Sequence, residues 1–420
     1  MRIGLLPYLD PTGGGTYQHS LNVLRAVRQI GEGSDDEFLV LARDLGEARR
    51  AGVVAAGHRL YPVSWRGEIS NRVRCLLGPG HVRALLRSLR REPHVIADPD
   101  AVSLKPRLTG RFRRLGLDLV YYPTLDPLAF EVDVPAIVTI HDLQAVLQPE
   151  MPDFVGQTTP WEYLLRNSVR RALLLVVDSE VGREDVLGAY GHLGLTADRV
   201  RILPYLPAPY LADEPPERAA ARVRDAYRLP ERFVFYPAQF WPHKNHRRLI
   251  EAIALLRRRT GSEVALVLCG GHGGELRERT FAEFCARAAE LGVADLVHYL
   301  GYVPDCDMAG LYRAAEALIF PTFFGPTNIP VVEAWSCGCP VLTSDIRGVR
   351  EHAGDAAILA DPASVDALAA ALGRLWTEPG LRAHLIACGH ARLAAYGADD
   401  FRRRLAGILD EAKARLREAR

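Results

Sequence analysis

The chain has 420 residues, which is more than one ordinary domain holds, so we expect two domains of roughly 200 residues, each with its own core. Hydrophobic residues at 48% and charged residues at 25% exclude a disordered chain, and the net charge of +1 gives no overall attraction to nucleic acid. The apolar runs are all shorter than the roughly 18 residues of a membrane-spanning helix, so no such helix is expected.

The first half of the chain alternates short apolar runs with amphipathic ones. This pattern predicts parallel strands that are covered by helices on both faces. Strands are expected at 2–7, 36–42, 59–64, 118–123, 135–140, 173–178 and 200–203. Helices are expected at 15–30, 80–91, 160–172 and 180–190. The N-terminus runs directly into the first strand, so we expect no signal peptide.

A polar, proline-bearing stretch at 206–229 is predicted to be a linker that contains an arginine-rich helix. The alternation then starts again. Strands are expected at 232–238, 263–270, 296–301, 316–321, 340–344 and 356–361. Helices are expected at 245–260, 275–291, 329–337 and 363–376, and a charged amphipathic helix fills the last twenty residues.

The predicted fold class is therefore α/β, with two Rossmann-like, doubly wound domains that face each other across a ligand cleft. The N-terminal domain is expected at 1–205 and the C-terminal domain at 230–398. The helix at 399–420 would form a separate element, able to return to the N-terminal domain.

Three glycines, at 13–15, lie between the first strand and the first helix. Their backbone can approach a ligand closely, and the helix start offers N–H groups to an anion; a tight turn is the alternative. The dinucleotide fingerprint is absent, because position 18 is Gln18, and the glycines at 270–274 fail the same test at Leu276. A nicotinamide enzyme is disfavoured.

Lys244 occupies the equivalent turn of the second half, between its first strand and first helix. Only three of the 52 basic residues are lysines, so a lysine that persists at this position is notable. A cation here could neutralise a diphosphate leaving group. The alternative is an ordinary surface lysine.

Two further motifs follow strand ends. A loop after Pro321 leads into a helix with Asn328 as its candidate cap, which predicts a second anion site. Glu333, one turn into that helix, could accept hydrogen bonds from a ribose diol or simply stabilise the helix dipole. His141 follows the strand 135–140 and could donate a hydrogen bond to a sugar hydroxyl, or be structural.

In their order and spacing these motifs resemble family 4 glycosyltransferases, a retaining group with the GT-B fold, over nearly the whole chain. The matching segments are GGGTYQHSLNVL (13–24), TIHDLQ (139–144), VVDSEVGREDVLGAYG (176–191), YPAQFWPHKNH (236–246), LGYVPD (300–305), PTFFGPTNIPVVEAWSCGCPV (321–341) and EHAGDAAILADP (351–362).

The resemblance implies a role for each matching residue. His141 would contact the transferred sugar, Lys244 would neutralise the diphosphate, and Glu333 would hold the ribose. The other positions implied in donor binding are Gly14 and Gly15 near the phosphates or sugar, Thr327, Asn328 and Ile329 through their amides, and Tyr302 and Val303 near the base.

Two positions in the donor site depart from the family pattern. The first of two glutamates spaced by seven residues would fall at Gly325, and the arginine expected five residues before the lysine is Gln239. One carboxylate and one cation are thus absent. Because a subset of the family shares FGPTNIP and QFWPHKN, we interpret these departures as variation rather than loss of activity.

The mechanism implied by the resemblance is reaction on one face of the sugar, with the leaving phosphate helping to deprotonate the acceptor. No motif supplies a carboxylate nucleophile for double displacement.

No metal is predicted: Asp98-Pro-Asp100 and Asp305-Cys-Asp307 match DxD formally, but Asp305 is expected to cap a helix. Cys337 and Cys339 lack a second Cys/His pair for zinc, which favours reduced thiols in a cytosol.

The expected function is transfer of a hexose from a nucleotide diphosphate sugar to a saccharide or lipid-linked acceptor in cell-surface polysaccharide synthesis. GDP-mannose is the first choice of donor, because chains with FGPTNIP are often mannosyltransferase-like; UDP-hexoses and dTDP-rhamnose stay open. No separate cofactor is expected. The alternatives are a nucleotide-sugar epimerase and a non-catalytic nucleotide-sugar-binding subunit.

A basic stretch at 66–114 holds twelve Lys or Arg residues against four acidic ones. Such a stretch could rest on an anionic membrane or hold a phosphate-bearing acceptor, although a solvated helical face is the commoner explanation. The expected location is the cytoplasm, with peripheral contact at the inner membrane face.

Overall fold

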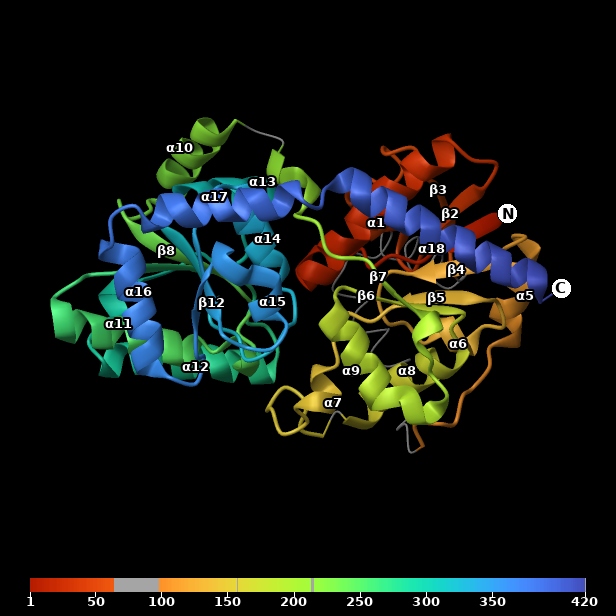
Figure 1. The fold of residues 1–420 in the computed structure, drawn as a ribbon, viewed down its shortest axis with the longest axis horizontal. Coiled ribbons are helices and arrows are strands. Elements are labelled where there is room, and N and C mark those ends of the chain that lie inside the picture. The colour runs from red at the N-terminus through yellow and green to blue at the C-terminus, as the bar shows by residue number, and fades with distance from the viewer. Residues whose placement is uncertain (64–97, 157, 213–214, 420) are drawn as a thin grey trace, which may run out of the picture. The chain divides into compact units, whose positions relative to one another are not determined.

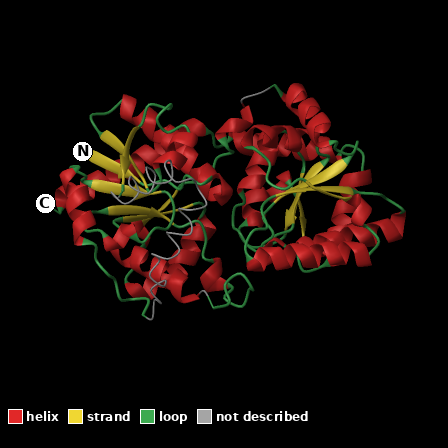
Figure 2. Ribbon diagram, turned by 180° about the vertical axis from the view of Figure 1, so that it is seen from behind, coloured by secondary structure: helices red, strands yellow, loops and turns green. Residues whose placement is uncertain are grey.

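The computed structural model describes residues 1–63, 98–156, 158–212 and 215–419 and divides into two compact units. The first unit comprises Met1–Val146, Gly156–Pro204 and Ala398–Arg420; the second comprises Leu147–Val155 and Tyr205–Gly397. Each unit is a parallel sheet between helices (Figure 2), so the predicted class of two Rossmann-like α/β domains is confirmed.

The first unit is built on a seven-stranded parallel sheet in the order β3-β2-β1-β4-β5-β6-β7. Its strands are β1 (Arg2–Leu5), β2 (Glu37–Ala42), β3 (Arg59–Pro62), β4 (Leu119–Tyr122), β5 (Ala136–Thr139), β6 (Leu174–Val177) and β7 (Val200–Ile202). All residues of β4, β5 and β6 are buried, as expected of strands that are covered on both faces.

Helices of the first unit come from both ends of the chain. They are α1 (Gly15–Glu32), α2 (Leu45–Arg50), α5 (Pro106–Arg114), α6 (Leu128–Glu131), α7 (Gln144–Leu147), α8 (Thr158–Arg171), α9 (Glu180–Tyr190) and α18 (Ala398–Glu418). The C-terminal helix α18 packs against α1 (Figure 1). Phe401 is fully buried there, and Lys413 donates to Asp36 at 2.6 Å.

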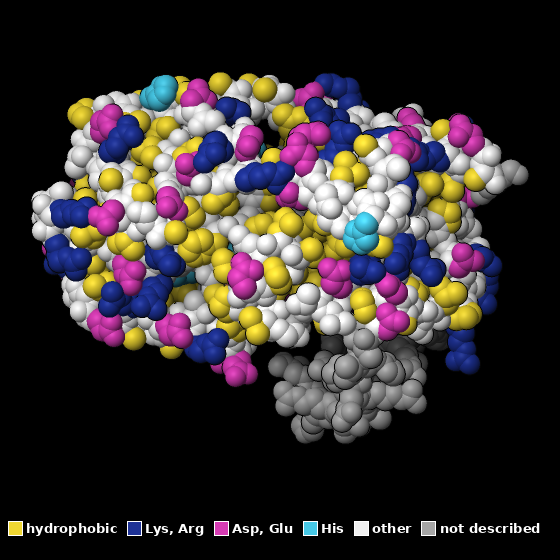
Figure 3. Space-filling model, turned by 60° about the horizontal axis from the view of Figure 1, so that its bottom comes forward, with side chains coloured by type: hydrophobic (Ala, Val, Ile, Leu, Met, Phe, Trp, Pro, Cys, Tyr) yellow, Lys and Arg dark blue, Asp and Glu magenta, His cyan; other side chains and the backbone are white. Residues whose placement is uncertain are grey.

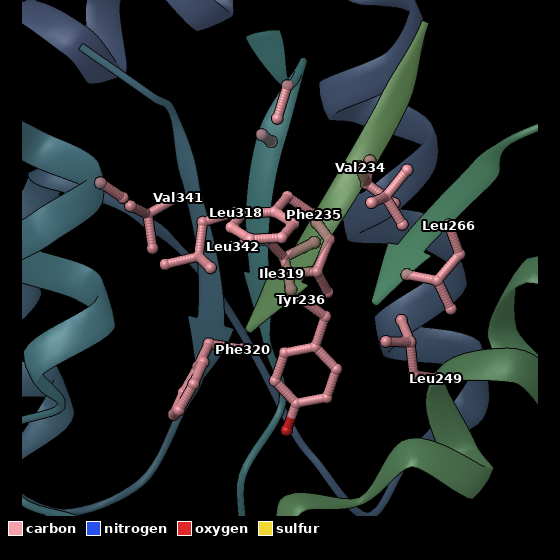
Figure 4. Close-up of a cluster of buried hydrophobic side chains, with 14 of the residues drawn as sticks. Val234, Phe235, Tyr236, Leu249, Leu266, Leu318, Ile319, Phe320, Val341 and Leu342 are labelled. Carbon is pink, nitrogen blue, oxygen red and sulfur yellow. The ribbon is translucent and has the colours of Figure 1, made fainter. Parts of the chain in front are cut away.

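The second unit has a six-stranded parallel sheet in the order β10-β9-β8-β11-β12-β13. Its strands are β8 (Phe233–Pro237), β9 (Ala265–Cys269), β10 (Val297–Tyr299), β11 (Ala317–Phe320), β12 (Val341–Ser344) and β13 (Ile358–Ala360). Figure 4 shows the side chains of β8, β11 and β12 gathered in its core, with the Tyr236 hydroxyl extending beyond them.

The helices of the second unit cover both faces of its sheet. They are α10 (Pro216–Tyr227), α11 (His246–Thr260), α12 (Glu275–Glu290), α13 (Asp305–Ala314), α14 (Ile329–Ser336), α15 (Val349–Ala353), α16 (Val365–Thr377) and α17 (Leu381–Ala394). Short 3-10 turns include η4 (Pro209–Ala212) and η5 (Pro242–Lys244).

The structure differs from the predicted boundaries in two places. The whole predicted linker belongs to the second unit, where α10 packs on α13 and buries Ala219 and Val223. The segment 147–155, expected in the N-terminal domain, also belongs to the second unit. The predicted helix 80–91 and residues 66–97 of the basic stretch lie outside the described residues.

Each sheet reverses its strand order at one point. The first sheet reverses between β1 and β4, and the second between β8 and β11. In open α/β sheets, ligands bind beside the carboxyl ends of the strands at such a point. The loops after β1, β8 and β11 are therefore the places to look for a site.

Surface charge is mixed in the part of the chain that the structure describes. On the face shown in Figure 3, Lys and Arg side chains alternate with Asp and Glu rather than gathering by sign. None of the described helices combines the length and the apolar character needed to cross a bilayer.

Candidate functional site

The turn after β8 carries Lys244 at the reversal point of the second sheet. Lys244 ends η5, and α11 begins two residues later. The Tyr236 hydroxyl donates to the Lys244 carbonyl at 2.5 Å, and the Lys244 ammonium lies 5.0 Å from the centre of the Phe320 ring. The position of the lysine is thus set by strands β8 and β11, which are neighbours in the sheet.

This turn is joined to the loop after β11. The Phe323 amide and the Thr322 hydroxyl donate to the His243 carbonyl at 2.9 and 3.2 Å. Asn245, which has a positive φ of 62°, donates through its side chain to Pro321 and Pro362 carbonyls at 3.0 and 2.8 Å. The two loops that the sequence singled out therefore form one hydrogen-bonded unit.

Asp153 adds a third segment to this unit. His243 Nδ1 lies 2.7 Å from Asp153 Oδ1, and the His243 amide donates to Asp153 Oδ2 at 3.2 Å. Gln148 also donates to the Phe323 carbonyl at 3.5 Å. These contacts explain why 147–155 groups with the second unit.

The sequence predicts an anion site at the start of α14. Asn328 is its N-cap residue, but its side chain donates to the Gly325 carbonyl at 3.2 Å instead of capping the helix. Asn328 therefore stands at the cap position predicted from the sequence, although its side chain makes no capping hydrogen bond. In the first turn, Pro330 has no N–H and the Val331 amide donates to the Asn328 carbonyl at 2.9 Å, so within the described residues the Ile329 amide is the one left for another acceptor. Thr327 lies in the same loop.

Gly325 is held in a conformation that disfavours other residues. Its φ is 121°, and a Cβ built there would lie 2.6 Å from Asn328 Oδ1. A glutamate at this position would strain the backbone and displace Asn328. The conformation of this loop therefore suits glycine at position 325 and disfavours a glutamate there.

Glu333 lies within α14 and is buried. Tyr312 of α13 donates to its Oε2 at 2.7 Å. Burial raises the pKa of Glu333 to about 7, against the lowering effect of the Tyr312 hydrogen bond, and the charge of Asp305 raises it further. The carboxyl can therefore take up or release a proton near neutral pH.

Gln239 and the segment 301–303 complete the predicted donor residues of the second unit. Gln239 Oε1 accepts hydrogen bonds from Trp241 Nε1 at 2.9 Å and from Arg277 Nη1 at 2.7 Å. Tyr302 is 57% exposed, so its ring is open to a ligand, whereas Val303 is buried. All of these residues follow carboxyl ends of strands in one sheet.

In the first unit, Gly14 and Gly15 open α1, and His141 follows β5. The His19 ring of α1 meets the His141 ring edge-on at 5.3 Å. Burial is the main reason that the pKa of His141 falls to about 4, although the charge of Asp142 and a hydrogen bond with the Pro123 backbone raise it. His141 is therefore a neutral imidazole at pH 7, suited to hydrogen bonding.

The formal DxD motifs have structural contacts. Asp100 binds Arg166 at 2.8 Å, and Asp307 binds Arg222 and the Tyr227 hydroxyl. Asp305 is the first residue of α13, whose N-cap is Pro304, so the expectation that Asp305 caps this helix is wrong. Within the described ranges, no group of three or more His, Cys, Asp or Glu side chains could hold a metal ion.

Sequence reasoning missed Asp153, Tyr312 and Arg277. Each acts through a contact with a residue far away in the chain, 90, 21 and 38 positions from its partner. Local patterns contain no signal for such pairs.

Comparison with known proteins gives a consistent result. A family model described as "Glycosyl transferases group 1" matches residues 218–392. The O-antigen chain mannosyltransferase B of Escherichia coli is 30% identical over 289 residues, 68% of this chain and 72% of that protein. A D-inositol 3-phosphate glycosyltransferase of Salinispora tropica is 30% identical over 62% of this chain, and the chain spans only 56% of its length.

Solved structures share the whole fold. Anabaena Alr3699/HepE in complex with UDP and glucose has a TM-score of 0.71 at 18% identity, covering 98% of this chain and 100% of that one. WaaG, a glycosyltransferase involved in lipopolysaccharide biosynthesis, has a TM-score of 0.66 at 16% identity, covering 97% and 99%. At these identities the likeness concerns the fold alone.

Proposed function

The chain belongs to the group 1 glycosyltransferases, and from this membership we propose that it transfers a hexose from a nucleoside diphosphate sugar with retention of anomeric configuration. The observation that carries the proposal is the hydrogen-bonded pair of loops after β8 and β11. They place an ammonium, from Lys244, and the amides of the α14 start at the reversal point of one sheet.

Each predicted residue has a role in this proposal. Lys244 neutralises the diphosphate as the glycosidic bond breaks. The amides of Thr327, Asn328 and Ile329 bind phosphate and sugar hydroxyls. Glu333 accepts hydrogen bonds from the ribose, and the base lies against 301–303. In the first unit, Gly14 and Gly15 approach the donor, and His141 contacts the transferred sugar.

Retention is proposed to proceed on one face of the sugar, without a covalent intermediate. A carboxylate nucleophile must be ionised and able to reach the anomeric carbon. Glu333 is buried, bonded to Tyr312 and has a pKa of about 7, which suits a hydrogen-bonding role better than attack. The protein then contributes positioning and charge neutralisation, with no metal.

Mannose is the proposed sugar and GDP-mannose the proposed donor, because the E. coli relative is named a mannosyltransferase. UDP-sugars are the alternative, since UDP and UDP-glucose are bound in the HepE structures. The proposed acceptor is a saccharide or lipid-linked oligosaccharide of a cell-surface polysaccharide. The proposed place is the cytoplasmic membrane face, with the 66–114 region against anionic lipid.

The first experiment is a thermal-shift panel of GDP, UDP, dTDP, ADP and CDP. We expect one base to raise the melting temperature selectively, and GDP first. Incubation with the matching sugar donor and an oligosaccharide acceptor should then give a product whose anomeric configuration, read by NMR, equals that of the donor. Inversion, or epimerised donor without transfer, would contradict the proposal.

A further inference from the structure

The loop between β9 and α12 lies directly against the turn that carries Lys244. Gly270 has a φ of 137°, and a Cβ built on it would lie 2.4 Å from the Ala238 carbonyl oxygen, so only glycine permits this approach. The Ala238 amide donates to the Cys269 carbonyl at 2.9 Å, and the Phe240 amide to Gly271 at 3.3 Å. These contacts bring the first turn of α12 beside the loop after β8.

Arg277, in that first turn, is fixed to the loop by two contacts. Its Nη1 donates to Gln239 Oε1 at 2.7 Å, and its guanidinium carbon lies 4.8 Å from the centre of the Trp241 ring. Trp241 donates to the same Gln239 oxygen, at 2.9 Å, and its carbonyl accepts from the Lys244 amide at 2.9 Å. The guanidinium therefore contacts Gln239 and Trp241, which precede the turn that carries Lys244.

The charge of Arg277 is left without an acidic partner. Its neighbours on α12 are paired: Arg279 with Glu283 at 3.9 Å, and Arg287 with Glu251 and Glu290 at 2.8 and 3.0 Å. Throughout the described residues, no carboxylate lies within ion-pair distance of Arg277, whose partners are an amide and an indole. A guanidinium oriented by neutral groups keeps its full charge for an anion.

We propose that Arg277 is a second cation for the donor diphosphate, supplied from α12 beside the amide of Gln239. A diphosphate carries more negative charge than one ammonium balances, and a guanidinium can bind two of its oxygens at once. Gln239 and Trp241 then serve to orient the guanidinium. This inference rests on the proposed function, since it assumes a nucleoside diphosphate at the Lys244 turn.

The test is titration of the full chain with a nucleoside diphosphate and with the monophosphate of the same base. The base is the one that wild type prefers in the thermal-shift panel. Arg277→Gln should weaken diphosphate binding by about tenfold or more and leave monophosphate binding much less affected. Arg279→Gln is the matched control, since it removes an equal charge from the same helix, and it should bind both ligands as wild type does.

Two further variants separate a charge effect from a structural one. Arg277→Lys should keep most of the affinity, because the charge remains, and it serves if Arg277→Gln fails to fold. The double variant Gln239→Arg, Arg277→Gln should recover affinity for the diphosphate, because it places a cation at position 239. No recovery would contradict the inference. Equal losses for diphosphate and monophosphate would also overturn it, because they indicate damage to the loop.

Failure of the inference is distinguishable from failure of the proposed function. If wild type binds none of the five diphosphates of the thermal-shift panel, the proposed function fails and this inference fails with it. If wild type binds one of them and Arg277→Gln binds it equally well, only the role of Arg277 is refuted.

Discussion

The carboxyl edges of the two sheets differ in the contacts that hold their loops. In the second unit, backbone and side-chain hydrogen bonds join the loops after β8, β9, β11 and β13, with Asn245 alone bonding two of them. In the first unit, the ring of His19 packs between His141 and Phe401, at 5.3 and 6.2 Å. The second edge holds ring contacts too, such as His246 stacked on Phe240 at 4.2 Å, but its loops are also joined to one another by hydrogen bonds.

The difference teaches how each edge can respond to a ligand. Hydrogen bonds fix loop geometry closely, so the loops of the second unit are held in place before a ligand arrives, which reduces the cost of binding. Ring packing is less directional, and it makes His141 depend on a helix from the far end of the chain. Substitutions should therefore affect the two edges in different ways.

The largest effect is expected from Phe401→Ala. Removing a fully buried ring should lower the free energy of unfolding by about 3–5 kcal/mol, because a cavity opens between α18 and α1. Hydrogen exchange should rise in α1 and around His141, while 236–245 stays protected. Equal loss of protection at both edges would show that they are not held independently.

Lys244→Ala should leave the fold intact and reduce transfer at least about 100-fold, about 3 kcal/mol, because a buried negative charge develops on the leaving group. Donor turnover, with and without acceptor, is the measurement. Lys105→Ala is the control, since Lys105 pairs with Glu131 in the first unit. Comparable activity of the two variants would refute the role of Lys244.

Glu333→Gln tests the ionisable group of the polar edge. Because the pKa of Glu333 is raised from 4.5 to about 7, folding favours its protonated form. Its contribution to stability therefore falls as the pH rises from about 4.5 to 7, and Glu333→Gln should remove this loss.

Nucleotide binding should show the opposite trend. Ribose hydroxyls donate best to an ionised carboxylate, so wild-type affinity should increase as the pH rises through about 7. Glu333→Gln should bind about tenfold more weakly at pH 8 and with little pH dependence. Titration calorimetry at pH 6 and pH 8 measures the affinity and its pH dependence. If Glu333→Gln retains the wild-type pH dependence, Glu333 is not the group that causes it.

The smallest effect is expected from Gly325→Ala. It should lower the free energy of unfolding by about 1–2 kcal/mol, because alanine is strained at a φ of 121° and its Cβ collides with the Asn328 side chain. Gly188→Ala is the control: it lies in α9 with no atom within 4 Å of the added Cβ, so it should be neutral or slightly stabilising. Thermal unfolding compares them. A stabilised Gly325→Ala would mean that the loop relaxes freely.

The sequence predicted the framework because parallel strands have a strong local signature. Each of the described strands lies within one of the predicted ranges, including the three-residue strands β7 and β13. The helix α17 was not predicted, since Leu385 and Gly389 are its only described residues that are buried and its apolar residues form no clear stripe. A local pattern fails where burial comes from tertiary packing.

The same limit applies to the candidate site. Lys244, Glu333 and His141 stand next to strand ends or helix starts, so chain order alone locates them at a carboxyl edge. Arg277 could not be identified, because it is one of many arginines and only its contact with Gln239 separates it from the others. Asp153 likewise depends on a contact 90 residues away.

The placement of α18 has a consequence for biosynthesis. Residues 398–420 complete a unit whose other parts end at Pro204, so α1 stays uncovered until a nascent chain has emerged from the ribosome beyond residue 398. The stretch from Tyr205 to Gly397 is released earlier and can fold ahead of it. Loss of residues 398–420 would therefore damage the unit whose other parts were translated first.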